Sequence, residues 1–237
     1  MAIRRIRPGV FFAPRAELPR GRHALDRDEV RQAQRERLMA AFTELVADQG
    51  LSSVTIADVV GHAGVSRAAF YGSFDGLPAC ADAAYERFIS VLLTRLGGAM
   101  NPTDDWYAFI QSAVSAYLEA LQADPVVARA MQIEMDAAGP SARLRRRHAL
   151  RQIADLIGVR YAQFRHEDPS IGPLPREAHL GLVYAVRQLA CDALEDDDPD
   201  LMPLAEPAIR WAAAAVLGAA SAEAGAERGG TTSRGIR

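Results

Sequence analysis

Apolar residues recur every three to four positions along most of the chain, which is the spacing of one face of an α-helix. The first such pattern spans residues 26–50 and ends at Gly50, a typical helix stop. Its apolar face consists of Leu38, Phe42, Leu45 and Val46. Later helical patterns lie near residues 78–97, 104–122, 125–137, 141–164, 175–195 and 202–222. No strand-like alternation stands out, so the pattern predicts an all-α fold.

Two short helical patterns, residues 55–63 and 66–74, are joined at the tetrapeptide AGVS. Thr55 and Ser66 are each placed to cap the N-terminus of a following helix. Gly64 supplies the permissive backbone that a tight turn between two packed helices needs. The second helix then has the form of a recognition helix for a DNA major groove, exposing Arg67, Ala68, Tyr71 and Ser73. We interpret the segment as a helix-turn-helix.

The segment resembles the DNA-binding domain of the TetR family of one-component bacterial transcription regulators, whose pattern runs roughly T-x-x-x-[IV]-A-x-x-A-G-V-S-x-x-x-x-Y-x-x-F. The matching positions are Thr55, Val59, Ala63, Gly64, Val65, Ser66, Tyr71 and Phe74. Val60 stands where the family usually has Ala. The resemblance implies an N-terminal three-helix helix-turn-helix domain, followed by a larger helical domain that binds a small-molecule effector and dimerises.

Breaks in the pattern predict the domain organisation. Gly97-Gly98 and Asn101-Pro102 mark a boundary between two functional regions. We expect a basic, irregular N-terminal arm, a helix-turn-helix domain with its connecting helix, a helical effector-binding and dimerisation domain, and a flexible tail, over residues 1–25, 26–97, 98–224 and 225–237, respectively.

The predicted DNA-facing residues offer sparse base readout. Arg67 could pair bidentately with the O6 and N7 atoms of guanine, or bind a phosphate instead. Ala68 can only contact a thymine methyl or leave room for the groove. The resemblance implies that Tyr71 places its hydroxyl on a phosphate and that Thr55 acts similarly, although Tyr71 could also be a core aromatic. The predicted DNA-facing set is Thr55, Ser66, Arg67, Ala68, Tyr71 and Ser73.

Two departures from the family pattern direct attention to the arm. Many relatives carry His where this chain has Ser73 and Lys where it has Leu77. Leu77 cannot reach the DNA backbone as the Lys does. Because the net charge is −3, a nucleic-acid contact must come from a local basic patch, and the arginine-rich arm provides one. We expect arm arginines to contact DNA, with a solubilising leader as the alternative, and the candidates are Arg4, Arg5 and Arg7.

Aromatic residues and methionines gather between the boundary and the last helices. Their chemistry favours a mostly apolar effector pocket, and plain core packing is the alternative. The predicted ligand-binding residues are Trp106, Phe109, Tyr117, Met131, Met135, Tyr161, Phe164 and Tyr184. Possible polar anchors are Gln132, Glu134, Gln163 and Arg187. The basic run Arg143, Arg145, Arg146, Arg147 and His148 is interpreted as a solvated face.

Two late helices carry broad apolar stripes. They resemble the helix pair through which the family forms a two-fold dimer interface, whereas periodicity alone also allows an intrachain core. The predicted interface residues are Leu182, Val183, Val186, Leu189, Ala190, Ala213, Val216 and Leu217. A dimer suits the function because two recognition helices can read two half-sites about 34–36 Å apart, or a multiple of that distance.

Other functional classes find little support in the sequence. No GxSxG, HExxH, Walker or GxGxxG motif is present, so we expect no catalytic residues, no metal site, no cofactor and no enzymatic activity. The two cysteines fit no metal or redox spacing, and no apolar run is long enough to span a membrane. We expect a cytoplasmic protein without a membrane partner.

The sequence therefore predicts a homodimeric transcription regulator that binds double-stranded operator DNA. We expect a repressor that a small apolar or amphipathic ligand releases from a palindromic operator. The alternatives are a ligand-independent regulator, an activator, or a non-DNA-binding helical ligand-binding protein or enzyme that keeps the helix-turn-helix as scaffold.

Overall fold

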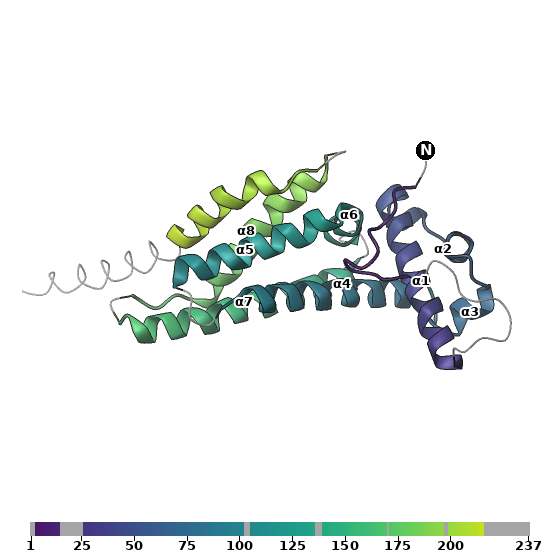
Figure 1. Cartoon of the computed structure of the whole chain (residues 1–237), viewed down its shortest axis with the longest axis horizontal. Coiled ribbons are helices and arrows are strands. Elements are labelled where there is room, and N and C mark those ends of the chain that lie inside the picture. The colour runs from purple at the N-terminus through teal and green to yellow at the C-terminus, as the bar shows by residue number, and fades with distance from the viewer. Residues whose placement is uncertain are drawn as a thin grey trace, which may run out of the picture.

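The computed structural model describes residues 3–14, 26–101, 105–135, 139–169, 171–196 and 199–215, and every regular element within these ranges is helical (Figure 1). The all-α prediction is therefore confirmed. The tail over residues 225–237 and the interface candidates Val216 and Leu217 lie outside the described residues.

Three helices at one end of the molecule form the helix-turn-helix unit (Figure 1): α1 (Arg27–Gln49), α2 (Ile56–Ala63) and α3 (Arg67–Tyr71). Asp26 begins α1 with a capping box, in which its carboxylate accepts the Glu29 amide while the Glu29 carboxylate accepts the Asp26 amide. Gly50 ends α1 at φ 75°, in the left-handed region that favours glycine. The helix ends predicted from these local signals agree with the structure.

The larger part of the chain is a bundle of longer helices: α4 (Leu77–Ala99), α5 (Trp106–Ala123), α6 (Pro125–Gln132), α7 (Pro140–Glu167) and α8 (Arg176–Leu194). A 3-10 turn, η3 (Met202–Leu204), leads into a helical segment over residues 205–215. Prolines occupy the first turns of α4, α6 and α7, where a missing N–H leaves no helix bond unmade. α6 ends at Gln132, earlier than the expected residue 137.

One helix joins the two parts. α4 leaves the helix-turn-helix unit and runs into the bundle (Figure 1), packing against α1 with one portion and against α5 with another. α6 also packs against α1, and α7 pairs most extensively with α8. The helix-turn-helix unit is therefore in direct contact with the bundle through both α4 and α6.

The described part of the N-terminal arm, residues 3–14, forms no helix and packs onto the body of the protein. Phe11 and Phe12 are each only 1% exposed, and the Phe11 ring lies 5.0 Å from that of Phe88 in α4. The guanidinium groups of Arg87 and Arg95, both in α4, donate to the carbonyls of Phe11 and Val10. The arm is thus part of the hydrophobic core, which the alternative of a merely solubilising leader does not describe.

Candidate functional site

The turn between α2 and α3 is built by two caps and one glycine. The Thr55 hydroxyl accepts the amide of Asp58, and the Asp58 carboxylate accepts both the amide and the hydroxyl of Thr55. These hydrogen bonds hold the pKa of the Asp58 carboxyl below its ordinary value. Gly64 ends α2 at φ 62°, and a Cβ there would come within 3.0 Å of Nη2 of Arg37. The Ser66 hydroxyl then accepts the Ala69 amide and starts α3.

α3 presents a small polar face to solvent. Arg67 and Ala68 are exposed, and Tyr71 is 52% exposed. Phe70 is fully buried in the core and meets the Tyr71 ring edge-on, with 5.6 Å between the ring centroids. The exposure of Tyr71 argues against its being a core aromatic, because Phe70 fills that role. The face can offer a guanidinium and a phenolic hydroxyl to DNA.

Two predicted DNA-facing residues are oriented differently. The Ser73 hydroxyl oxygen is buried and has no hydrogen-bond partner in the described structure. The Ser73 carbonyl accepts Nη1 of Arg35, whose guanidinium also stacks over the Phe74 ring. Ser73 is therefore corrected to a structural position, because the turn after Tyr71 directs its side chain inward. Both polar hydrogens of Thr55 are committed to Asp58, so we also withdraw its direct phosphate contact.

Arg5 and Arg7, which were predicted to bind DNA, make contacts within the protein. Nη1 of Arg5 lies 2.8 Å from the Glu44 carboxylate and 3.0 Å from Nε2 of His62. The guanidinium of Arg7 donates to the Ala123 carbonyl, and its main-chain amide donates to Asp124. These contacts fix the arm to α1, α2 and the α5–α6 junction. The DNA role expected for Arg5 and Arg7 is corrected to a tethering role, and the role of Arg4 stays a prediction.

Glu44 is the centre of a polar cluster beneath the helix-turn-helix. Its side chain is only 7% exposed, and Oε2 lies 2.6 Å from Nε2 of His62. Oε1 accepts the main-chain amide of Ile6 at 3.0 Å. The carboxylate therefore joins α1, α2 and the arm through hydrogen bonds that satisfy both of its oxygens. Sequence reasoning missed this cluster because its members are far apart along the chain.

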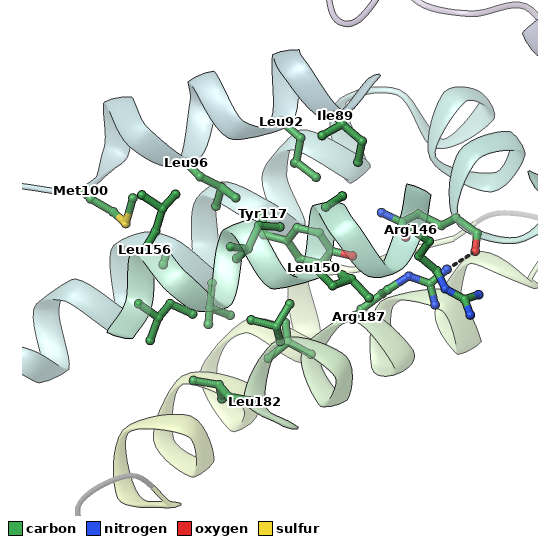
Figure 2. A pocket seen from close by; sticks show the side chains of 18 of the residues that line it. Ile89, Leu92, Leu96, Met100, Tyr117, Arg146, Leu150, Leu156, Leu182 and Arg187 are labelled. Atoms are coloured by element: carbon green, nitrogen blue, oxygen red, sulfur yellow. Dashed lines mark hydrogen bonds between the residues drawn. The ribbon is translucent and has the colours of Figure 1, made fainter. Parts of the chain in front are cut away.

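The bundle encloses a mainly apolar cavity (Figure 2). Helices α4, α5, α7 and α8 supply most of its wall, and the end of α6 adds Gln132. The cavity is lined by Tyr85, Ile89, Leu92, Leu96, Met100, Ile110, Ala113, Val114, Tyr117, Gln132, Arg146, Ala149, Leu150, Ile153, Leu156, Ile157, Leu182, Val183, Val186 and Arg187. Gln132 and Arg187, named from the sequence as possible anchors, belong to this wall, whereas Glu134 and Gln163 do not.

Tyr117 is the predicted ligand-binding residue that does line this cavity. Its hydroxyl is buried with no hydrogen-bond partner in the described structure, and burial raises its pKa. The other predicted residues are corrected. Trp106 packs against Phe109, Tyr161 and Phe164, with ring centroids 5.6, 5.2 and 6.1 Å away. Met131 and Met135 are buried in the hydrophobic core and do not line the cavity. Tyr184 is 38% exposed and lies outside the cavity.

The predicted dimer residues also divide. Leu182, Val183 and Val186 face the cavity, and Ala190 and Ala213 are buried within this chain. These apolar residues are buried, as their spacing predicts, but they pack against the interior of their own chain and not against a second copy. Leu189 is 43% exposed and remains a candidate. Exposed apolar side chains outside the predicted dimer set include Trp211, at 49% exposure, and Leu144 and Val159 on α7.

A surface groove lies between α4 and α7 beside the cavity. Ile89, Tyr85 and Ala149 line both spaces, so they form the partition between them. Arg145 and His148 from the basic run of α7 border the groove, and Arg145 pairs with Asp82 at 2.6 Å. Arg146 turns to the cavity instead. The basic run is therefore only partly the solvated face predicted from the sequence.

Comparison with known proteins identifies the helix-turn-helix. Residues 38–80 match the family model described as bacterial regulatory proteins, tetR family. No curated protein matches the sequence. Within the described residues, no helix is long and apolar enough to cross a membrane and no cluster suits a metal ion.

Solved structures share the fold across most of the chain. The fatty acid degradation regulator FadR from Bacillus halodurans has a TM-score of 0.69 and 16% identity, over 76% of this chain and 94% of that one. A transcriptional regulator from Rhodococcus sp. has a TM-score of 0.64 and 25% identity, over 78% and 97%. FadR from Bacillus subtilis, in complex with stearoyl-CoA, has a TM-score of 0.68 and 13% identity, over 76% and 98%.

These matches confirm the resemblance predicted from the sequence. Regulators of this family bind DNA and are not enzymes, so the expectation of a non-enzymatic protein is also confirmed.

Proposed function

We propose that this chain, whose residues 38–80 match the TetR family of bacterial regulatory proteins, is a homodimeric repressor. A small amphipathic ligand would release it from a palindromic operator. The ligand would occupy the cavity of the bundle. The cytoplasmic location expected from the sequence stays a prediction.

The observation that carries this proposal is the path of α4. This helix begins at Leu77, six residues after α3 ends at Tyr71, and its later turns supply Leu92 and Leu96 to the cavity wall. A ligand that moves the wall therefore acts on the helix that carries the reading head. If ligand and operator prefer different positions of α4, each weakens the binding of the other by the same factor. The corresponding coupling free energy is typically about 1–3 kcal/mol.

The DNA contacts that we propose are few. Arg67 would pair with a guanine or a phosphate, Tyr71 would donate its hydroxyl to a phosphate, and Ala68 would lie against a base edge. Ser66 would add a contact at the start of α3, where backbone amides favour an anion. Because one such helix reads little sequence, the proposal requires two copies related by a two-fold axis.

We place the dimer interface on the exposed apolar faces near the C-terminus. Tyr184 and Leu189 project from α8 to solvent, and Trp211 projects from the helical segment over residues 205–215. Large apolar and aromatic side chains of this kind are typical interface anchors. Leu189→Glu should leave the fold intact and shift the mass measured by light scattering from dimer to monomer. An unchanged mass would exclude this face.

The chemistry of the cavity supports an effector with a substantial apolar part. Most of its wall is aliphatic, and burial of an aliphatic group stabilises a complex by about 25 cal/mol per Å². The FadR structure from Bacillus subtilis, which contains stearoyl-CoA, supports an effector of this type for the shared fold. Polar groups at a few positions would then set specificity.

The function is tested by selecting bound duplexes from a random DNA pool with the full-length protein. A palindromic winner whose affinity falls steeply between two salt concentrations is expected, since phosphate contacts release counterions. Arg67→Ala and Tyr71→Phe should weaken its binding, while Tyr107→Phe, at an exposed tyrosine of α5, should not. If no sequence is enriched and neither variant alters binding, the chain is not an operator-binding regulator.

A further inference from the structure

The polar residues of the cavity are concentrated at one end. Figure 2 shows the Tyr117 hydroxyl directed toward the side where Arg146 and Arg187 lie, whereas Met100, Leu96 and Leu156 occupy the opposite side. The cavity is therefore amphipathic along its length, with an apolar end and an end that carries hydrogen-bond donors.

Arg187 is held in place within this polar end. It is 8% exposed, and its guanidinium donates to the main-chain carbonyl of Gln132 (Figure 2). A guanidinium has five N–H donors in a rigid fork, so a bond to one carbonyl is compatible with a further bond to an oxygen in the cavity. The anchoring to Gln132 fixes the direction from which that oxygen must approach.

Tyr117 adds an independent indication of a ligand. Its hydroxyl is buried, lines the cavity and makes no hydrogen bond in the described structure. A buried donor that stays unsatisfied destabilises the protein, so the natural partner is an acceptor that enters with the ligand. Because burial raises the pKa of Tyr117, this hydroxyl stays protonated and can donate.

We infer that the ligand is an acyl compound, with a linear apolar chain along the aliphatic wall and an anionic or carbonyl oxygen head beside Tyr117, Arg146 and Arg187. This inference rests on the proposed function and names the chemical class of its effector. A cationic head would face two guanidinium groups, and a neutral hydroxyl would use them poorly. A carboxylate or thioester oxygen accepts from both kinds of donor.

The space available suggests the chain length to test first. The cavity volume is about 80 Å³, counted as the space open to the centres of water molecules. One water needs roughly 10–15 Å³ on this measure, so the space accepts roughly five to eight waters without any movement of the wall. A medium chain is therefore the appropriate probe.

The test is isothermal titration calorimetry of the full-length protein with octanoate, octanoyl-CoA, 1-octanol and octyltrimethylammonium. We expect octanoate or octanoyl-CoA to bind at least about tenfold more tightly than the other two probes, since a hydrogen bond to a charged group has that effect. Preference for octanoate identifies a free acid, and preference for octanoyl-CoA identifies a thioester. Equal or tighter binding of the alcohol or the cation, or no binding of either acyl probe, would overturn the inference.

Matched variants locate the head. Arg146→Gln and Tyr117→Phe should each weaken the preferred acyl probe about tenfold and leave 1-octanol unchanged. Their controls are Arg147→Gln, at the exposed neighbour on α7, and Tyr107→Phe on α5, which should bind as the parent protein does. Thermal melts confirm that all four variants fold. Equal effects in variants and controls would contradict the assigned position of the head.

A parallel DNA titration separates this inference from the proposed function. If the acyl probe binds with the expected variant pattern but leaves operator affinity unchanged, the ligand class stands and release by ligand fails. If another chemical class displaces the protein from DNA while acyl probes do not bind, release by ligand stands and the ligand class fails.

Discussion

The main-chain amide of Arg7 donates a 2.8 Å hydrogen bond to Oδ2 of Asp124, 117 residues later in the chain. The other oxygen of the same carboxylate accepts the Val127 amide and caps α6. Asp124 thus binds the arm at Arg7 and also caps α6, a helix that packs against α1. This one buried side chain joins the N-terminal arm to the helical bundle.

Truncation of the arm's aromatic anchor should destabilise the protein. Phe12 is 1% exposed, so Phe12→Ala should lower the free energy of unfolding by about 3–5 kcal/mol through lost burial and the resulting cavity. Phe12→Leu, which keeps most of the volume, should have a much smaller effect. Urea unfolding monitored by circular dichroism measures both. A loss below about 1 kcal/mol in Phe12→Ala would show that the arm is not part of the core.

Asp124 should make stability depend on pH in the acid range. Burial raises its pKa above the ordinary value of 3.8, against the opposing effect of the Arg7 and Val127 amides. The folded state then binds more protons than the unfolded state between the two pKa values, so the contribution of Asp124 to stability declines as pH rises through that window. Asp124→Asn should remove this dependence.

Asp124→Ala should remove the same pH dependence and also lower stability by about 1 kcal/mol, because α6 loses its cap. Urea titrations at several pH values provide the comparison. A pH profile that is identical in all three proteins would show that Asp124 does not titrate differently on folding.

His179 should make the free energy of unfolding rise with pH, opposite to the effect of Asp124. It is 5% exposed and packs edge-on against Tyr161, and burial lowers its pKa below 6.5. As pH falls through 6.5, the unfolded state gains a proton before the folded state does, so the free energy of unfolding falls, at most by about 1.4 kcal/mol per pH unit. His179→Phe should flatten this slope, which urea titrations at several pH values measure.

The salt dependence of operator binding should distinguish two arginines. Arg67 is exposed on α3, so Arg67→Ala should reduce the slope of log affinity against log salt by about 0.9 if it binds a phosphate. The guanidinium of Arg7 donates to the Ala123 carbonyl, so Arg7→Ala should leave the slope unchanged. Fluorescence anisotropy with a labelled operator measures both slopes. A reduced slope for Arg7→Ala would restore Arg7 as a DNA contact.

The thiol of Cys80 should report unfolding. It lies in the first turn of α4 and is fully buried, and burial raises its pKa to about 12. Because the thiolate is the reactive form, an aromatic disulfide reagent should modify Cys80 only when the protein unfolds. A Cys191→Ala background isolates the signal. Rapid modification of the folded protein would contradict the packing around α1 and α4.

Local signals predicted much of the fold. Thr55, Ser66 and Gly50 specify helix ends through hydrogen bonds within a few residues, so their roles can be inferred from neighbouring letters alone. The arm was harder to place. Phe11 and Phe12 pack against α4, a contact between distant residues that helical periodicity does not encode.

The same limit explains the errors at the cavity. A stripe such as Leu182, Val183 and Val186 shows that a face is buried but not whether a cavity, a core or a partner covers it. Trp106 and Tyr117 lie on one helix and are both buried, yet only Tyr117 reaches the cavity. The difference depends on how α7 and α8 are placed around α5, which no local pattern determines.

The thin partition between the cavity and the α4–α7 groove has a kinetic consequence. Ile89 and Ala149 line both spaces, and α7 packs far more extensively against α8 than against α4. Separation of α7 from α4 therefore disrupts fewer contacts than separation from α8, and the exchange of a bound molecule should follow this seam. Residence time would then depend on how often the seam opens, so a larger side chain on the groove side alone, as in Ser90→Leu, should slow both association and dissociation. Equilibrium affinity would change less than either rate, so the duration of a response could be tuned apart from its sensitivity.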